Sequence, residues 1–150
     1  MLVGGLIFFL PPPLATQLHE TMADQYQRVI LTPGITVELD ERSAIAVTNS
    51  EPLSIELIKG NAYFDSNNTS AQIQALEIVV SDVRFLAKGA SFSLETLKKG
   101  GRIAISNGQL EMNIGDQARS VSAGQRIDFN SNRVIEEISI VDLDIASWRR

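Results

Sequence analysis

The fold is decided by Ile55-Glu56-Leu57-Ile58-Lys59-Gly60-Asn61-Ala62-Tyr63-Phe64-Asp65. Before Gly60, the apolar residues Ile55 and Leu57 alternate with polar ones, which is the period of a strand with one buried face. After it, the apolar set begins at Ala62 and includes Phe64, so the alternation changes phase at the glycine. Because only glycine adopts positive φ at little cost, this phase change predicts a tight turn or a bulge between two strands.

The same design recurs in Ile103-Ala104-Ile105-Ser106-Asn107-Gly108-Gln109-Leu110-Glu111-Met112. Asn-Gly between alternating segments is the strongest short signal for a hairpin. With Asn107 and Gly108 as a two-residue loop, Ile105 is expected to face Leu110 on one apolar face. Ile103 would face Met112 on that face, and Ala104 would pair with Glu111 on the other. The chain therefore reads as strand pairs separated by glycines.

Turn signals and short alternating segments continue along the chain, and few stretches have a helical period. We predict an all-β fold of two stacked antiparallel sheets, with sandwich or solenoid-like winding. The uneven spacing of the glycines disfavours a regular repeat. Two short non-strand segments are expected. Residues 16–28 place Leu18, Met22 and Tyr26 four apart, as in an amphipathic helix or a juxtamembrane linker, and Asp142 is expected to cap a helix running through Trp148.

The beginning of the chain is strongly apolar. Leu2–Leu10 is an unbroken apolar run that ends at three prolines. It is about half of the ~20 residues that a bilayer-spanning helix needs. We expect the outer half of a truncated membrane anchor or export segment here, because consecutive prolines suit a central strand poorly; an apolar first strand is the alternative. The expected division is an anchor and linker over 1–28 and a β domain over 29–150.

Composition narrows the functional classes. The chain has 150 residues, 44% hydrophobic and 21% charged, which fits one folded domain. Its 13 basic and 18 acidic side chains give a net charge of −5, with no basic block, so nucleic-acid binding is not expected. The absence of cysteine excludes disulfides and thiolate metal sites.

No group of residues has the pattern of a catalytic or metal site. His19, the single histidine, sits in the proline-led tail and is expected to lie away from the sheets, without a catalytic partner. The segment 89–93 lacks the last glycine of a nucleophile elbow and reads as a strand entry. The segment from Asp128 begins like a calcium loop, but Arg133 replaces its glycine. Asp142 and Asp144 are expected to face solvent or cap a helix. We expect no enzyme, cofactor, metal or small-molecule substrate.

Seven pieces of the chain, in order, resemble the FecR family, whose founding members regulate iron-citrate uptake in Gram-negative bacteria. The pieces are 31–34, 39–44, 57–64, 88–92, 105–110, 122–125 and 147–150. Their turn and hairpin landmarks are Gly34, Gly60, Phe64, Gly89, Phe92, Asn107, Gly108, Gly124 and Trp148. Pro33 and Ala90 depart from the family's pattern but keep the turns, which indicates a divergent member.

The resemblance implies a non-catalytic, periplasmic sensing domain of an anti-sigma regulator, tethered to the inner membrane through the N-terminal segment. Its partner would be the signalling domain of an outer-membrane receptor, and the contact would alter release of a sigma factor. The segment that holds the sigma factor would precede the membrane helix, so no residue here is assigned to it. The loops 65–70 and 98–101 are the expected contact regions.

Two alternatives remain open at the level of sequence. One is a structural or binding module of the cell envelope that shares the fold and has no sigma partner. The other is a single-anchor β-jellyroll that carries lipid, which would need an apolar groove between its sheets. In each case the working surface would be exposed strand edges and loops rather than a reactive centre.

Overall fold

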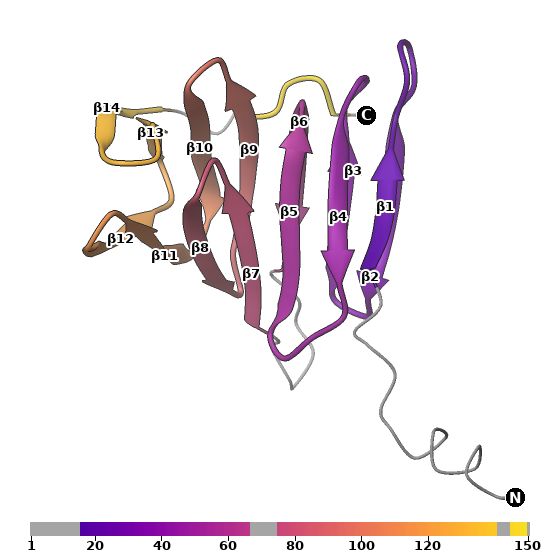
Figure 1. Ribbon diagram of the computed structural model, residues 1–150, viewed down its shortest axis with the longest axis horizontal. Helices are drawn as coiled ribbons and strands as arrows, with labels where there is room; N and C mark the ends of the chain where they lie inside the picture. Colours follow the sequence, from indigo (N-terminus) through magenta and orange to yellow (C-terminus); the bar gives the residue numbers. More distant parts are fainter. Residues whose placement is uncertain (1–15, 67–74, 141–144, 150) are drawn as a thin grey trace, which may run out of the picture.

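The structure is a computed structural model that describes residues 16–66, 75–140 and 145–149. The described residues form two seven-stranded sheets (Figure 1). Sheet A contains, in spatial order, β1 (Thr16–Glu20), β4 (Ala44–Thr48), β5 (Leu53–Lys59), β7 (Ala75–Val80), β8 (Val83–Lys88), β11 (Gln109–Ile114) and β12 (Gln117–Ser122). Sheet B contains β14 (Val134–Ser139), β13 (Gln125–Phe129), β10 (Gly100–Asn107), β9 (Ser91–Leu97), β6 (Asn61–Asp65), β3 (Ile35–Leu39) and β2 (Gln27–Thr32).

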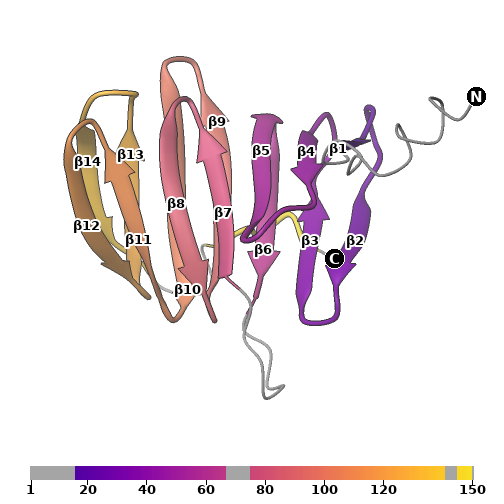
Figure 2. The ribbon, with the colours of Figure 1, turned by 60° about the horizontal axis from the view of Figure 1, so that its bottom comes forward.

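The two sheets stack face to face, as the two views together show (Figures 1 and 2). Neighbouring strands are antiparallel except β5 and β7, which are parallel. The predicted all-β class with two stacked sheets is therefore confirmed. No helix in the described part of the chain has the length and apolar character needed to cross a bilayer.

Along the chain, a hairpin within one sheet is followed by a connection to the other sheet, which we call a corner. The hairpin β2–β3 belongs to sheet B, β4–β5 to sheet A, and β9–β10 again to sheet B. Glycines with positive φ stand at four of the corners: Gly60 after β5, Gly89 after β8, Gly108 after β10 and Gly124 after β12. The phase changes in the sequence therefore mark passages between layers.

The predicted hairpin at Asn107-Gly108 is wrong. Strand β10 pairs with β9 and β13 in sheet B, whereas β11 pairs with β8 and β12 in sheet A. Ile105 accordingly lies opposite Phe92, and Leu110 opposite Ala87. A hairpin and a corner both keep Ile105 and Leu110 on the apolar side, so the alternation fits either. Long-range pairing decides between them.

The corners stack closely on one another. Gly60 has a φ of 84°, and a Cβ there would lie 2.6 Å from Ser43 Cα and 2.7 Å from the carbonyl oxygen of Arg42, in the preceding corner. Gly108 has a φ of 78°, and its Cβ would lie 2.6 Å from the carbonyl oxygen of Gly89. Both positions therefore need glycine for its conformation and for its size.

Aromatic rings fill the space between the sheets. The Phe64 and Phe92 rings stack with centroids 5.2 Å apart, and Phe85 and Phe129 meet edge-on at 5.4 Å. All four side chains are essentially buried. Inward-facing aliphatic residues from both sheets surround them, so the interior is a packed hydrophobic core.

The predicted helix over 16–28 is wrong, because this segment contains strand β1 and the start of β2. Strand β1 forms the edge of sheet A by pairing with β4. Leu18 and Met22 are 62% and 59% exposed, so they do not form a buried helical face. A spacing of four also places residues on one face of a strand, which explains the misreading.

The helix expected from Asp142 to Trp148 is absent from its described part, since 145–149 consists of bends and a turn. Asp142 and Asp144 lie outside the described residues, as does the predicted anchor at 2–10. The sequence predicts His19 in a tail away from the sheets. In the structure, His19 belongs to β1 and lies opposite Ile45.

Candidate functional site

A row of charged side chains crosses the outer face of sheet B. Strand register places Asp128 of β13 opposite Arg102 of β10, and Arg102 opposite Glu95 of β9. Glu136 of β14 lies opposite Asp128. Because alternate residues of a strand share a face, these side chains point away from the core, which Ile103 and Ile127 enter. We call Glu95, Arg102, Arg126, Asp128 and Glu136 the ion-pair row.

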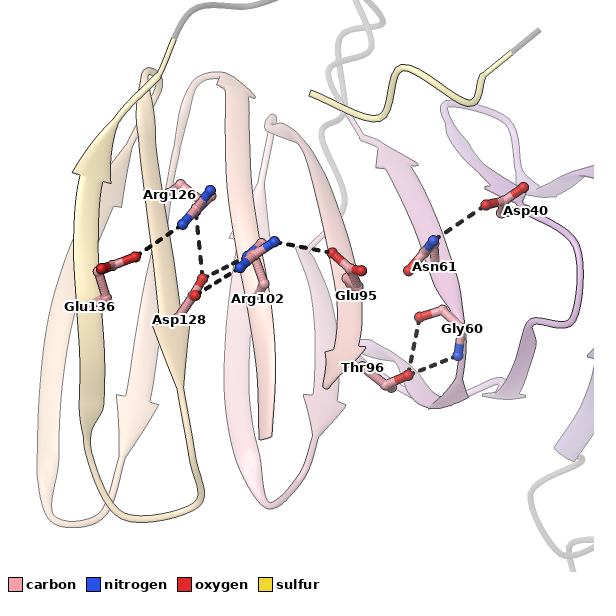
Figure 3. A network of polar contacts seen from close by, with 9 residues as sticks. All are labelled: Asp40, Gly60, Asn61, Glu95, Thr96, Arg102, Arg126, Asp128 and Glu136. Atoms are coloured by element: carbon pink, nitrogen blue, oxygen red, sulfur yellow. Dashed lines mark hydrogen bonds and ion pairs between the residues drawn. The ribbon is translucent and has the colours of Figure 1, made fainter. Parts of the chain in front are cut away.

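Arg102 holds the centre of the row (Figure 3). Its Nε and Nη2 donate to the two carboxylate oxygens of Asp128 at 2.7 and 2.9 Å. Its Nη1 lies 3.7 Å from Glu95 Oε1. Arg126 donates from Nη2 to Glu136 Oε1 at 3.1 Å, and its Nε lies 3.6 Å from Asp128 Oδ1. This two-point pairing of Arg102 with Asp128 is the strongest kind of ion pair in proteins.

The pairing shifts the acid–base behaviour of both partners. The hydrogen bond from Arg102 lowers the pKa of Asp128, and partial burial opposes that change. The hydrogen bond to Asp128 likewise raises the pKa of Arg102, again against burial. Both groups therefore stay charged at neutral pH and act as fixed polar features of the face.

Residues 145–149, which we call the strap, lie across the same face, in yellow in Figure 1. Ile145 is buried against Tyr63 of β6 and Ala104 of β10. The Arg149 guanidinium lies 3.7 Å from the centroid of the Tyr63 ring, and its Nε donates to Glu38 Oε2 at 2.9 Å. The strap thus joins the end of the chain to β3 and β6.

Glu38 is the buried anchor of the strap. Its side chain belongs to β3, and the residue is 7% exposed. Tyr26 donates its hydroxyl to Oε1, while Arg149 binds Oε2. The Trp148 ring meets the Tyr26 ring edge-on, with centroids 6.4 Å apart. A buried carboxylate with both oxygens bonded makes this contact specific, because an unpaired one would be costly.

A groove of about 660 Å³ separates the strap from the ion-pair row. Glu95, Arg102 and Arg126 line it on one side, and Trp148 lines it on the other. Ala104 and nearby serines contribute small side chains. The groove thus combines an aromatic wall with a wall of paired arginines and carboxylates, and its volume is within the usual range of ligand sites.

The sequence landmarks lie mostly away from this groove. Gly34 shapes the β2–β3 hairpin, and Asn107 ends β10. Gly60, Gly89, Gly108 and Gly124 form corners, and Phe64 and Phe92 are in the core. Among the landmarks, only Trp148 lines the groove.

The ion-pair row was missed at the level of sequence. The sequence does show charged residues at outward-facing positions of β9, β10 and β13. It does not show that these strands are neighbours, and only their pairing brings the charges together. Asp128, weighed above as the start of a calcium loop, binds Arg102 instead. Asn130 accepts hydrogen bonds from the backbone N–H groups of Asn132 and Arg133, which closes the turn after β13.

The described residues contain no group of three or more His, Cys, Asp or Glu side chains that could hold a metal ion. Among the described residues, the buried Nε2 of His19 makes no hydrogen bond. The residue opposite it in the sheet is Ile45, so the strand register places no nucleophile there.

The FecR protein family model matches residues 17–111, which is well over half of the chain. This chain belongs to the FecR family. The match begins within β1 and runs into β11, so it covers strands of both sheets. The FecR resemblance noted in the sequence is therefore confirmed.

Two crystal structures of candidate anti-sigma factors from Parabacteroides distasonis ATCC 8503 share the fold. The one at 2.50 Å resolution has a TM-score of 0.75 at 13% identity and covers 89% of this chain. The one at 1.65 Å has a TM-score of 0.73 at 14% identity and covers 88%. In each case the match spans 64% of the crystallised chain, so this FecR chain matches only part of the length of either structure. A search of curated proteins gave no match.

Proposed function

We propose that this FecR chain is the non-catalytic periplasmic sensing domain of a membrane-anchored anti-sigma regulator. In this proposal, the signalling domain of an outer-membrane receptor contacts the sandwich, and the contact alters release of a sigma factor across the inner membrane. The family match over residues 17–111 carries the proposal. The fold shared with candidate anti-sigma factors supports it.

The outer face of sheet B supports a role in protein recognition. It combines paired charges, an aromatic residue and a groove, whereas the face toward sheet A is filled by the core. Arginine and tryptophan are enriched where proteins bind one another. The segments 65–70 and 98–101 remain the expected contact regions. Asp65 ends β6, Gly100 and Gly101 begin β10, and 67–70 lie outside the described residues.

A pull-down against purified signalling domains of candidate outer-membrane receptors tests the relay. Retention of one such domain by the folded chain is the expected result. A second arm asks whether that receptor domain changes sigma-factor activity in cells that carry the complete regulator. A folded chain that retains none of the receptor domains contradicts the proposal.

The structure gives no support to lipid carriage. That function needs an apolar groove between the sheets, and the Phe64–Phe92 and Phe85–Phe129 contacts occupy that space. Lipid extraction followed by mass spectrometry gives an independent check. The envelope-module alternative is separated from the relay by the genome neighbourhood, because an adjacent sigma-factor gene favours regulation.

A further inference from the structure

The groove on sheet B contains an arginine with few hydrogen bonds. A guanidinium carries five N–H donors. Within the described part of the chain, Arg126 makes one hydrogen bond, to Glu136, and its Nε is buried without a hydrogen-bond partner. The 3.6 Å separation from Asp128 is an ion pair but too long for a good hydrogen bond. Arg102, by contrast, makes two good hydrogen bonds to Asp128.

The partner of Arg126 is also weakly held. Glu136 is 57% exposed as a side chain, whereas Arg126 is 24% exposed. An exposed ion pair contributes about 0–1 kcal/mol, because water and salt screen it. A carboxylate brought into the groove can therefore share or replace Glu136 at little cost. It would bond to the Nη groups of Arg126, because the Nε donor is buried and out of reach of a ligand.

The other side of the groove is apolar. Trp148 and Ala146 of the strap line it, as do Ile138 and Ile140 at the end of β14. The strap itself shows that this face accepts a non-helical segment lying across its strands. A ligand that lies beside the strap meets arginine on one edge and tryptophan on the other.

We propose that this groove docks an extended segment of a partner protein in which an Asp or Glu stands beside apolar residues. The carboxylate binds Arg126, and the apolar side chains pack on Trp148 and Ile138. This inference rests on the proposed function, since it places the partner's contact on sheet B. The chain's net charge of −5 repels an acidic partner, and the three carboxylates of the ion-pair row outnumber its two arginines. Recognition therefore depends on direct contact with the Arg126 guanidinium, well within one Debye length of ~8 Å at physiological salt.

The test begins with a displayed library of random linear heptapeptides, selected on the full chain and counter-selected on an Arg126→Gln variant. Enrichment of Asp or Glu flanked by apolar residues is expected. Trp148 is the single tryptophan, so its fluorescence reports binding of each enriched synthetic peptide directly. We expect a saturable change, and amide replacement of the acidic residue should remove most of it.

Matched variants assign the binding to the groove. Arg126→Gln should weaken the affinity at least about tenfold, the loss expected for one charged hydrogen bond. Arg84→Gln makes the same charge change on β8 of sheet A, where Arg84 is 62% exposed, and should leave the affinity unchanged. Ser139→Phe narrows the groove at an exposed position and should also weaken binding, so the test does not depend on one variant. Circular dichroism melts confirm that each variant folds.

Several outcomes overturn the inference. These are no enrichment over the counter-selection, equal affinities for wild type and Arg126→Gln, or full competition by sodium acetate at the peptide's carboxylate concentration, which would indicate a small-anion site. The relay is judged separately, by pull-down with the receptor domain. Receptor binding that is unaffected by Arg126→Gln contradicts the groove as the contact site and still supports the relay. Arg126-dependent peptide binding without any receptor binding contradicts the relay and supports the groove as a peptide site.

Discussion

Gly60 and Gly124 have nearly the same positive φ, 84° and 87°, but different surroundings. A Cβ at Gly60 would lie 2.6 Å from Ser43 Cα, whereas at Gly124 the nearest atom is 3.9 Å away. Both alanine variants suffer the same strain of positive φ, so their difference isolates the steric term. We expect Gly60→Ala to lower the free energy of unfolding by about 1–3 kcal/mol more than Gly124→Ala. Urea denaturation measures both, and equal losses would contradict the stacked-corner geometry.

Asp128 makes the stability of the fold depend on pH in the acid range. Arg102 lowers its pKa in the folded state, so its contribution is complete above the unfolded value of about 3.9 and is lost as pH falls through the folded value. We expect Asp128→Asn to lower the free energy of unfolding by about 1.5–3 kcal/mol at pH 7, nearer the lower figure because Arg102 is a third exposed.

The difference between wild type and Asp128→Asn should shrink steadily below about pH 4 and vanish at lower pH. Urea denaturation at a series of pH values follows it. Asp116→Asn, an exposed change in the β11–β12 turn, is the control and should have little effect at any pH. If the two free energies of unfolding still differ in acid, the variant acts through packing and not through the charge of Asp128.

At the scale of elements, the strap is held by one ion pair together with the apolar contacts of Ile145 and Trp148. Arg149→Met leaves Glu38 with Tyr26 as its remaining donor among the contacts described above. We expect a loss of about 1.5–3 kcal/mol in the free energy of unfolding. Iodide should also quench Trp148 more strongly as the strap loosens. Arg149→Lys keeps the charge but not the flat stacking on Tyr63, so it should fall between wild type and Arg149→Met. Unchanged quenching in Arg149→Met would mean that the apolar contacts of Ile145 and Trp148 hold the strap without the ion pair.

Sequence predicted the strands well because alternation is a local signal. Leu53, Ile55 and Leu57 are buried where the period of two requires. Strand partners were not predictable in the same way, since the pattern at Gly108 fits a hairpin and a corner equally. The strap contact was out of reach, because Arg149 and Glu38 are 111 positions apart and neither belongs to a periodic motif. The strap forms one wall of the groove, so the groove could not be predicted without the strap contact.

At the scale of the whole molecule, one core joins the two sheets. Phe92 of β9 stacks on Phe64 of β6 and is fully buried, so Phe92→Ala should cost about 3–5 kcal/mol. Domains of this kind usually unfold in one step, so circular dichroism and Trp148 fluorescence should give the same shifted urea midpoint. Leu86→Ala, at a position 40% exposed, should change stability by no more than about 0.5 kcal/mol. Midpoints that separate would show that the strap face melts independently.

The position of the strap in the chain has a consequence for biosynthesis. The residues that it contacts in the described part of the chain, among them Tyr26, Tyr63 and Ala104, leave the ribosome before it does. A nascent polypeptide, or one clipped by a protease ahead of residue 145, therefore displays the Glu38 carboxylate and the Tyr63 ring without their cover. Copies that contain the strap and copies that lack it therefore differ in surface chemistry at one defined spot.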